Sequence, residues 1–315
     1  MESLIHNLSS DNWLQPANQI EKILKPLIQG PTGAIKIIKQ EIFNQNKNEK
    51  LRDIREDFDS KKSTNNLDER INEYSNKMYL VNTEINDLLS FDYIRIFSKN
   101  INWDSTNKEL EIVVNAIKNN KINNTYVLGR LHGILSKLVM GSISQSNKIL
   151  AGIAGEELGR AILVSAGLIE NNTFKAQYIS EYGSKTDFIT PAIENNNDHN
   201  VECFIAVQYS SNDRARMVDS ELNVNGNKFF ITFNGCQGST KKLKDIGKPI
   251  LASQHLKRFQ LVCLKQHLED EKERLNDIIS NNVRDSTNNK RVLEFLKSNS
   301  LGFEEFAIKL QKRYV

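Results

Sequence analysis

The sequence predicts an α/β protein in which a small mixed β-sheet follows a long helical region. Three observations lead to this prediction. Apolar residues recur with helical spacing over most of residues 1–125, β-rich runs bounded by turn residues appear after residue 180, and strands then alternate with helical segments. Strands interleaved with helices are the pattern of an α/β core.

Composition places the chain among globular proteins. It has 315 residues, 39% of them hydrophobic, with 42 Lys and Arg against 39 Asp and Glu. No apolar run approaches the roughly 18 residues that a membrane-spanning helix needs, and the N-terminus lacks the layout of a signal peptide. We therefore expect a cytoplasmic protein without a membrane partner, long enough for one elaborated domain or two.

The first predicted region is helical and covers residues 1–125. Two of its stretches each place four apolar residues on one helix face. These residues are Ile20, Ile23, Leu24 and Leu27 in the first stretch, and Leu110, Val113, Val114 and Ile117 in the second. The highly polar segment 44–66 between them predicts a solvated helix or a linker.

Residues 126–270 are predicted to hold the α/β core, and residues 271–315 a helical extension. Periodic apolar residues from Tyr126 lead into a largely buried helix over 149–168. Gly167 is suited to the C-cap of that helix, because glycine adopts the left-handed conformation there without steric cost.

Strands and further helices follow. Proline and clusters of Asn, Asp and Gly separate the runs that are rich in β-branched and aromatic residues. The predicted strands are 185–190, 201–208, 228–233 and 249–252. The predicted helices are 211–222, 240–246 and a long one from His255.

The three cysteines, Cys203, Cys236 and Cys263, are too few and too scattered for a disulfide framework or a zinc knuckle. We therefore expect buried, reduced thiols.

Acidic and polar side chains gather at one end of the predicted sheet. Asp187 sits on one strand, Gln208 closes the next strand 21 residues later, and Glu221 follows 13 residues further on the next helix. Two carboxylates aimed at one point repel unless a cation lies between them, and Mg²⁺ prefers a few carboxylates with waters and phosphate oxygens. Such a site suits phosphodiester hydrolysis, although each acid alone is more commonly a cap or an exposed carboxylate.

Asp213 and Arg214 begin the next predicted helix and suit base recognition. Arg donates two hydrogen bonds to guanine O6 and N7, and a carboxylate accepts from cytosine N4. With Ser211 or Asn212 as N-cap, the helix start would present both side chains to base edges. The other interpretation is an acid favoured at a helix N-terminus beside a solvent-facing arginine. Arg216, about 200° round the helix, is expected to touch phosphate.

A basic stretch follows the strand at 228–233. Its lysines can grip a DNA backbone, or can simply form a solvated helix face. They are Lys241, Lys242, Lys244 and Lys248. Residues 201–265 hold ten Lys and Arg against five Asp and Glu. A chain of net charge +3 thus carries a locally basic segment where DNA would need it.

The segment from Gln208 to Glu221 resembles the signature of type II restriction endonucleases with the PD-(D/E)XK nuclease fold, in particular the group that cuts CCGG and CCNGG sites. In that group an acid lies on one strand and a lysine ends the next. An adjacent acid and arginine open the following helix, which also carries the second metal-binding acid. The matching residues are Asp187, Gln208, Asp213 with Arg214, and Glu221, and a glutamate of the preceding core helix matches Glu156 or Glu157.

The resemblance covers about residues 147–265 and departs from the family at two positions. Thr186 stands where proline is usual, and Gln208 where lysine is usual. Neutral glutamine positions a water by hydrogen bonds but brings no positive charge. The resemblance implies a restriction endonuclease in which Asp187 and Glu221 bind Mg²⁺, acting as a homodimer on double-stranded DNA. The alternatives are a DNA-binding protein on a non-catalytic nuclease scaffold and a repair or structure-specific nuclease.

Overall fold

The computed structural model describes most of the chain. The described residues are 1–30, 32–100, 107–119, 122–179, 185–193, 200–208, 226–233, 235–236, 259–281 and 286–315. Packing divides the chain into two units, Met1–Arg52 with Leu80–Leu150 and Asp53–Tyr79 with Ala151–Val315. Three long helices contribute residues to both units.

The first unit is helical. It contains α1 (Glu2–Asn7), α2 (Leu14–Gln29) and α5 (Lys108–Lys118), with parts of α3 (Ala34–Ser60), α4 (Leu67–Asn100) and α6 (Thr125–Ser165). All four residues of the predicted apolar face of α5 are buried, and on α2 Ile20 and Leu24 are buried while Ile23 is 37% exposed. Helical structure is confirmed for the described part of residues 1–125, and the polar segment is helical as far as Ser60.

The second unit contains a six-stranded mixed sheet in the order β1-β2-β3-β4-β5-β6. Its strands are β1 (Lys175–Ile179), β2 (Lys185–Thr190), β3 (Cys203–Gln208), β4 (Asn227–Thr232), β5 (Phe259–Val262) and β6 (Ser300–Leu301). The first three strands are antiparallel and the last four are parallel. The predicted α/β class with a small mixed sheet is confirmed, and the strands predicted at 185–190, 201–208 and 228–233 are β2, β3 and β4.

One face of the sheet packs on α6 and on α11 (Phe303–Tyr314). Gly159 of α6 is required here, because a Cβ would lie 2.8 Å from Val207 and 3.0 Å from Phe188. The ring of Phe229 lies 4.8 Å from that of Phe306 in α11. Close helix packing therefore fixes this face, to which Phe188, Val207 and Phe229 all point.

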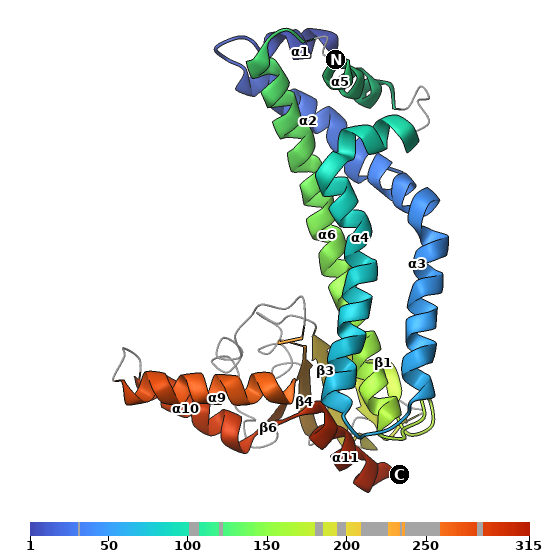
Figure 1. Ribbon diagram of the computed structural model, residues 1–315, viewed down its shortest axis with the longest axis vertical. Coiled ribbons are helices and arrows are strands. Elements are labelled where there is room, and N and C mark those ends of the chain that lie inside the picture. The colour runs from blue at the N-terminus through green and yellow to red at the C-terminus, as the bar shows by residue number, and fades with distance from the viewer. Residues whose placement is uncertain are drawn as a thin grey trace. The chain divides into compact units, whose positions relative to one another are not determined.

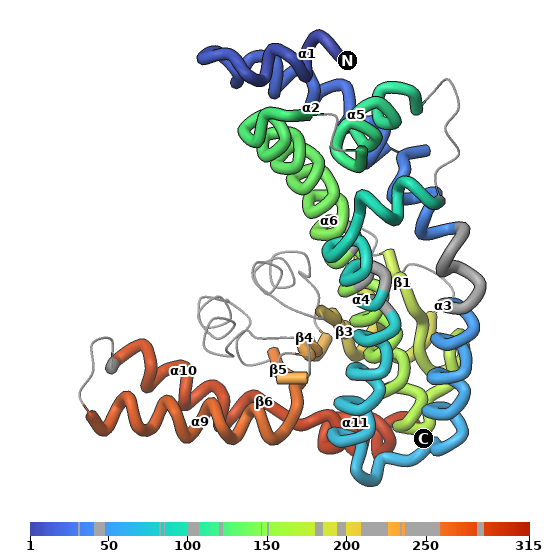
Figure 2. The backbone as a smooth tube through the Cα atoms, turned by 45° about the horizontal axis from the view of Figure 1, so that its top comes forward, coloured from blue at the N-terminus to red at the C-terminus, as the bar shows by residue number. Residues whose placement is uncertain are grey.

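The opposite face packs on α9 (Lys265–Ser280) and α10 (Ser286–Ser298), which lie side by side in both views (Figures 1 and 2). Phe204 of β3 and Phe230 of β4 join Leu268 of α9 and Leu296 of α10 in one buried cluster. Because helices cover both faces, the parallel strands are apolar on both sides.

The helix predicted over 149–168 corresponds to the end of α6, which stops at Ser165. Gly167 has a φ of +85°, and Leu168 N–H donates to the Leu163 carbonyl at 3.2 Å, as a glycine C-cap requires. The helix and its cap are confirmed. Its predicted burial is wrong at the start, because Ile149 and Ile153 are 56% and 59% exposed.

The long helix predicted from His255 is wrong over residues 259–262, which form β5; α9 begins at Lys265. Three of the four residues of β5 are buried, so the run shows no alternation, and a short apolar run fits helix and strand alike. The sequence also left out β1 and the two-residue β6. The strand predicted at 249–252, the helices at 211–222 and 240–246, and His255 lie outside the described residues.

All three cysteines are free and buried, as predicted. Burial raises the pKa of the Cys236 thiol to about 12, and burial also raises the pKa of Cys203 and Cys263. The thiols therefore stay protonated at neutral pH and act as small apolar side chains.

Candidate functional site

Asp187 and Gln208 lie on adjacent strands at one end of the sheet. The pairing of β2 with β3 extends to Phe188 opposite Ile205, and continuing this register by one position places Asp187 opposite Ala206. Because side chains alternate along a strand, Asp187, Ala206 and Gln208 share one face, opposite to the face of Phe188. Two of the predicted site residues are thereby brought together by the antiparallel pairing.

The Asp187 carboxylate is held against the end of β3. Its Oδ2 accepts a hydrogen bond from the Val207 backbone N–H at 2.6 Å, and the side chain is half-buried. Val207 directly precedes Gln208. The bond therefore fixes a carboxylate beside the carboxyl end of the strand that carries Gln208.

Gln208 ends β3 and pairs in register with Thr232, which ends β4. Its Oε1 is buried, and no described residue donates a hydrogen bond to it. A buried acceptor without a donor costs free energy, so a cation or an ordered water at this point would be favourable.

The oxygen atoms of Asp187 and Gln208 are the kind of donor that Mg²⁺ prefers, and Mg²⁺ commonly needs only one or two protein carboxylates because it keeps several waters. The donor set therefore fits Mg²⁺. In the part of the chain that the structure describes, no group of three or more His, Cys, Asp or Glu residues is placed to hold a metal. A Mg²⁺ site at this strand end would therefore need further ligands from water, from substrate or from residues that the structure does not describe, such as Glu221.

The structure separates the two glutamates of α6. Glu157 Oε1 lies 3.2 Å from Arg55 Nε and 3.3 Å from Arg160 Nη2, and it accepts a hydrogen bond from the Tyr74 hydroxyl at 3.2 Å. Glu156 is exposed. Glu157 thus belongs to an ion cluster that joins α3, α4 and α6, which makes Glu156 the more accessible of the two candidates.

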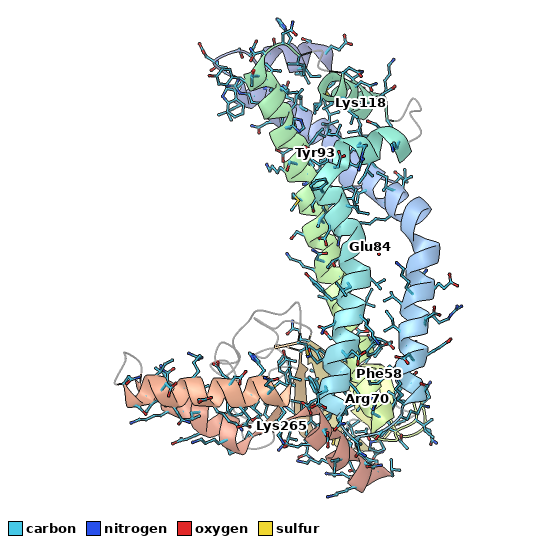
Figure 3. The ribbon with its side chains drawn as sticks, viewed as in Figure 1. Phe58, Arg70, Glu84, Tyr93, Lys118 and Lys265 are labelled. Atoms are coloured by element: carbon cyan, nitrogen blue, oxygen red, sulfur yellow. The ribbon has the colours of Figure 1, made fainter. Side chains whose placement is uncertain are left out.

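Aromatic packing extends this ion cluster. The rings of Phe58 and Tyr74 stack with centroids 4.7 Å apart. The Arg70 guanidinium lies 4.6 Å from the Phe58 ring centroid, and Figure 3 labels both Phe58 and Arg70. Burial, and then the Glu157 carboxylate, raises the pKa of the Tyr74 hydroxyl above its ordinary value. Tyr74 therefore stays protonated and donates to Glu157.

Replacing Glu157 with glutamine is expected to lower the free energy of unfolding by about 1–3 kcal/mol, because two arginines lose a shared, partly buried anion. Urea unfolding followed by circular dichroism measures the change. The Glu156→Gln variant is the matched control, since Glu156 is the exposed neighbour, and it should unfold within about 0.5 kcal/mol of the wild type. Equal stability of the two variants would contradict a structural role for Glu157.

Several predicted site residues lie outside the described residues. They are Glu221, Asp213, Arg214, Arg216, Lys241 and Lys242, with Lys244 and Lys248 of the same basic stretch. The second metal-binding acid and the base-reading pair therefore remain predictions.

Two polar residues at this end of the sheet are not among the site residues that the sequence predicts. Thr232 is buried beside Gln208, and Lys185 is the exposed first residue of β2. Lys185 lies two positions before Asp187 and therefore shares its face. The sequence shows that Lys185 and Asp187 alternate with Thr186, but only the pairing of β2 with β3 shows that Lys185 lies near Gln208.

None of the helices in the described part of the chain combines the length and the apolar character needed to cross a membrane. Comparison with known proteins finds no match to a family model, a curated protein or a solved structure.

Proposed function

We propose that the protein is a Mg²⁺-dependent type II restriction endonuclease that hydrolyses phosphodiester bonds of double-stranded DNA at a short GC-containing site. One observation carries the proposal: Asp187 and Gln208, predicted as partners from their spacing, lie on one face of adjacent strands, and the backbone N–H of Val207, the residue before Gln208, donates a 2.6 Å hydrogen bond to the Asp187 carboxylate. The order of α6 and the following strands also agrees with a PD-(D/E)XK-type core.

The residues have distinct roles in this proposal. Asp187 and Glu221 would hold Mg²⁺, which when bound lowers the pKa of water and offsets charge on the phosphate. The Gln208 amide orients the attacking water by hydrogen bonds. Glu156 would support the site from α6, which packs on the other face of the sheet, so its exposed side chain would have to reach the site around the strand ends.

Hydrolysis forms one bond from a water oxygen to phosphorus and breaks the bond to the leaving sugar oxygen. The water releases one proton, and the leaving oxygen takes one up. Asp213 and Arg214 would read G·C pairs in the major groove, while Arg216, Lys241 and Lys242 would contact the backbone. A palindromic site would be matched by a two-fold homodimer.

The second candidate is a DNA-binding protein on a non-catalytic nuclease scaffold. One residue favours it: the neutral Gln208 stands where the family uses lysine. This candidate predicts DNA binding that weakens with salt and no cleavage with any divalent metal.

Incubating the purified protein with plasmid DNA and Mg²⁺ tests the proposal. We expect discrete fragments with ends at one sequence, and none when EDTA removes the metal. Salt-dependent binding without cleavage would establish the non-catalytic candidate instead. Cleavage of branched or damaged DNA, with intact plasmid left uncut, would replace the restriction proposal with a repair or structure-specific nuclease.

A further inference from the structure

Among the described residues, the ends of β3 and β4, where the proposed chemistry takes place, carry no positive charge. Gln208 closes β3 with a neutral side chain, and its neighbour in β4 is Thr232. Negative charge grows on the phosphate oxygens during hydrolysis, and a preorganised cation at that point is worth a large factor in rate. The strand pairing indicates where such a cation comes from.

The register of β2 and β3 brings Lys185 to Gln208. The antiparallel pairs run from Thr190 with Cys203 to Phe188 with Ile205. Continuing them by three positions places Lys185 opposite Gln208. The backbone pairs themselves end at Phe188 with Ile205, and beyond them the Val207 N–H donates to the Asp187 carboxylate, which keeps the two strands together as far as these residues. Lys185 itself is fixed in the sheet by its pairing with Ile179 of β1.

Lys185 also points to the required face. Thr186 is buried and Asp187 half-buried, and alternation puts Lys185 and Asp187 on the same side of β2. Residues directly opposite one another in an antiparallel pair have Cβ atoms about 5 Å apart. A lysine with its flexible four-carbon stem can therefore bring its ammonium group over Gln208 or a phosphate beside it.

The other lysines of the described strands are Lys175 and Lys228, and neither is free to reach this end of β3. Lys175 of β1 donates to the Ile193 carbonyl at 3.3 Å. Lys228 of β4 is fully buried and pairs in register with Phe204, four residues from Gln208, or about 13 Å. Lys185 is exposed, and no described acid forms an ion pair with it. Among the described strands, Lys185 is thus the lysine available at this edge.

We propose that Lys185 supplies the positive charge that Gln208 lacks, contacting the scissile phosphate and stabilising its developing negative charge in the transition state. This inference rests on the proposed nuclease function. Lys185 stays protonated throughout, so the bonds made and broken are those of phosphodiester hydrolysis. The Lys185 ammonium group of β2 would then supply the charge and the Gln208 amide of β3 would orient the water, two roles that a single lysine at the position of Gln208 fills in the family that the sequence resembles.

Single-turnover cleavage of plasmid DNA in Mg²⁺ tests the inference. The variants remove the positive charge from position 185, keep it there as arginine, or move it to position 208. Lys185→Gln should slow cleavage about a hundredfold, and Lys185→Arg should lose less than about tenfold because the charge remains. Combining Lys185→Gln with Gln208→Lys should recover most of the lost rate, since the register makes the two positions neighbours. The matched control is Lys312→Gln, an exposed lysine of α11, which should cleave like the wild type.

Two further readouts separate charge from structure. Thermal melting should be unchanged in the Lys185 variants, and DNA affinity without Mg²⁺ should change by less than about threefold, because one phosphate contact among many is lost. Lys185→Gln cleaving at the wild-type rate, or a double variant no faster than Lys185→Gln, would overturn the role of Lys185 and leave the nuclease proposal standing. A wild-type protein that fails to cleave DNA overturns both.

Discussion

Replacing Asp187 with asparagine is expected to reduce the DNA cleavage rate by at least about a thousandfold, or on the order of 4 kcal/mol of transition-state stabilisation. The substitution removes the negative charge that would hold Mg²⁺. It keeps a carbonyl oxygen that can still accept the Val207 N–H bond, which the carboxylate accepts at 2.6 Å. Single-turnover cleavage of plasmid DNA measures the rate.

The structural role of Asp187 can be separated from its chemical role by a second variant. Asp187→Ala removes both the charge and the acceptor, so it should lose cleavage and also lower the free energy of unfolding by about 1–2 kcal/mol. The control is Asp270→Asn, which removes an exposed carboxylate from α9 and should change neither quantity. If Asp187→Asn cleaved DNA normally and Asp187→Ala were merely less stable, Asp187 would only hold the two strands together, and its assignment as a metal-binding residue would fail.

The strands that could be predicted are those with clear local boundaries. Pro191 directly follows the end of β2, and Gly226 directly precedes β4. β5 lacked such help, because burial of three of its four residues removes the alternation that identifies a strand. β1, Lys175–Ile179, is a short edge strand whose pairing with β2 rather than its composition determines its conformation.

The candidate site divides in the same way. Asp187 and Gln208 could be predicted because residue type and spacing along the chain are local information, and strand order then placed them on one face. The partners of Glu157 could not, since Arg55 and Tyr74 lie 102 and 83 residues earlier in the sequence and only helix packing brings them to it. Lys185 needed the register of β2 on β3, which a single sequence does not specify.

Asp68, at the start of α4, ties together two other helices of the second unit. Its Oδ1 accepts the backbone N–H groups of Lys265 at 2.7 Å and Phe303 at 3.3 Å, and its Oδ2 accepts that of Glu304 at 2.9 Å. Lys265, labelled in Figure 3, begins α9 and Phe303 begins α11. The first N–H groups of a helix have no partner within it, and the helix dipole favours an anion there.

Both helices leave the sheet directly after parallel strands, α9 after β5 and α11 after β6. One carboxylate therefore anchors two strand-to-helix turns at the edge of the sheet where parallel strands end. Gly302 allows the close approach, since a Cβ there would lie 3.1 Å from Lys265 Cβ and 3.2 Å from Asp68 Oδ2. Removing the carboxylate leaves three backbone donors without their acceptor.

Replacing Asp68 with alanine is accordingly expected to lower the free energy of unfolding by about 2–4 kcal/mol, because each charge-assisted cap contributes about 1 kcal/mol or more. Urea unfolding followed by circular dichroism measures the loss. Glu69→Ala is the matched control: Glu69 is an exposed acid in the same first turn of α4, so its removal affects the dipole of α4 but not α9 or α11. Asp68→Asn should fall between the two, since an amide offers one acceptor oxygen and no charge. A loss for Asp68→Ala no larger than that for Glu69→Ala would mean that the two helix starts are satisfied without this carboxylate.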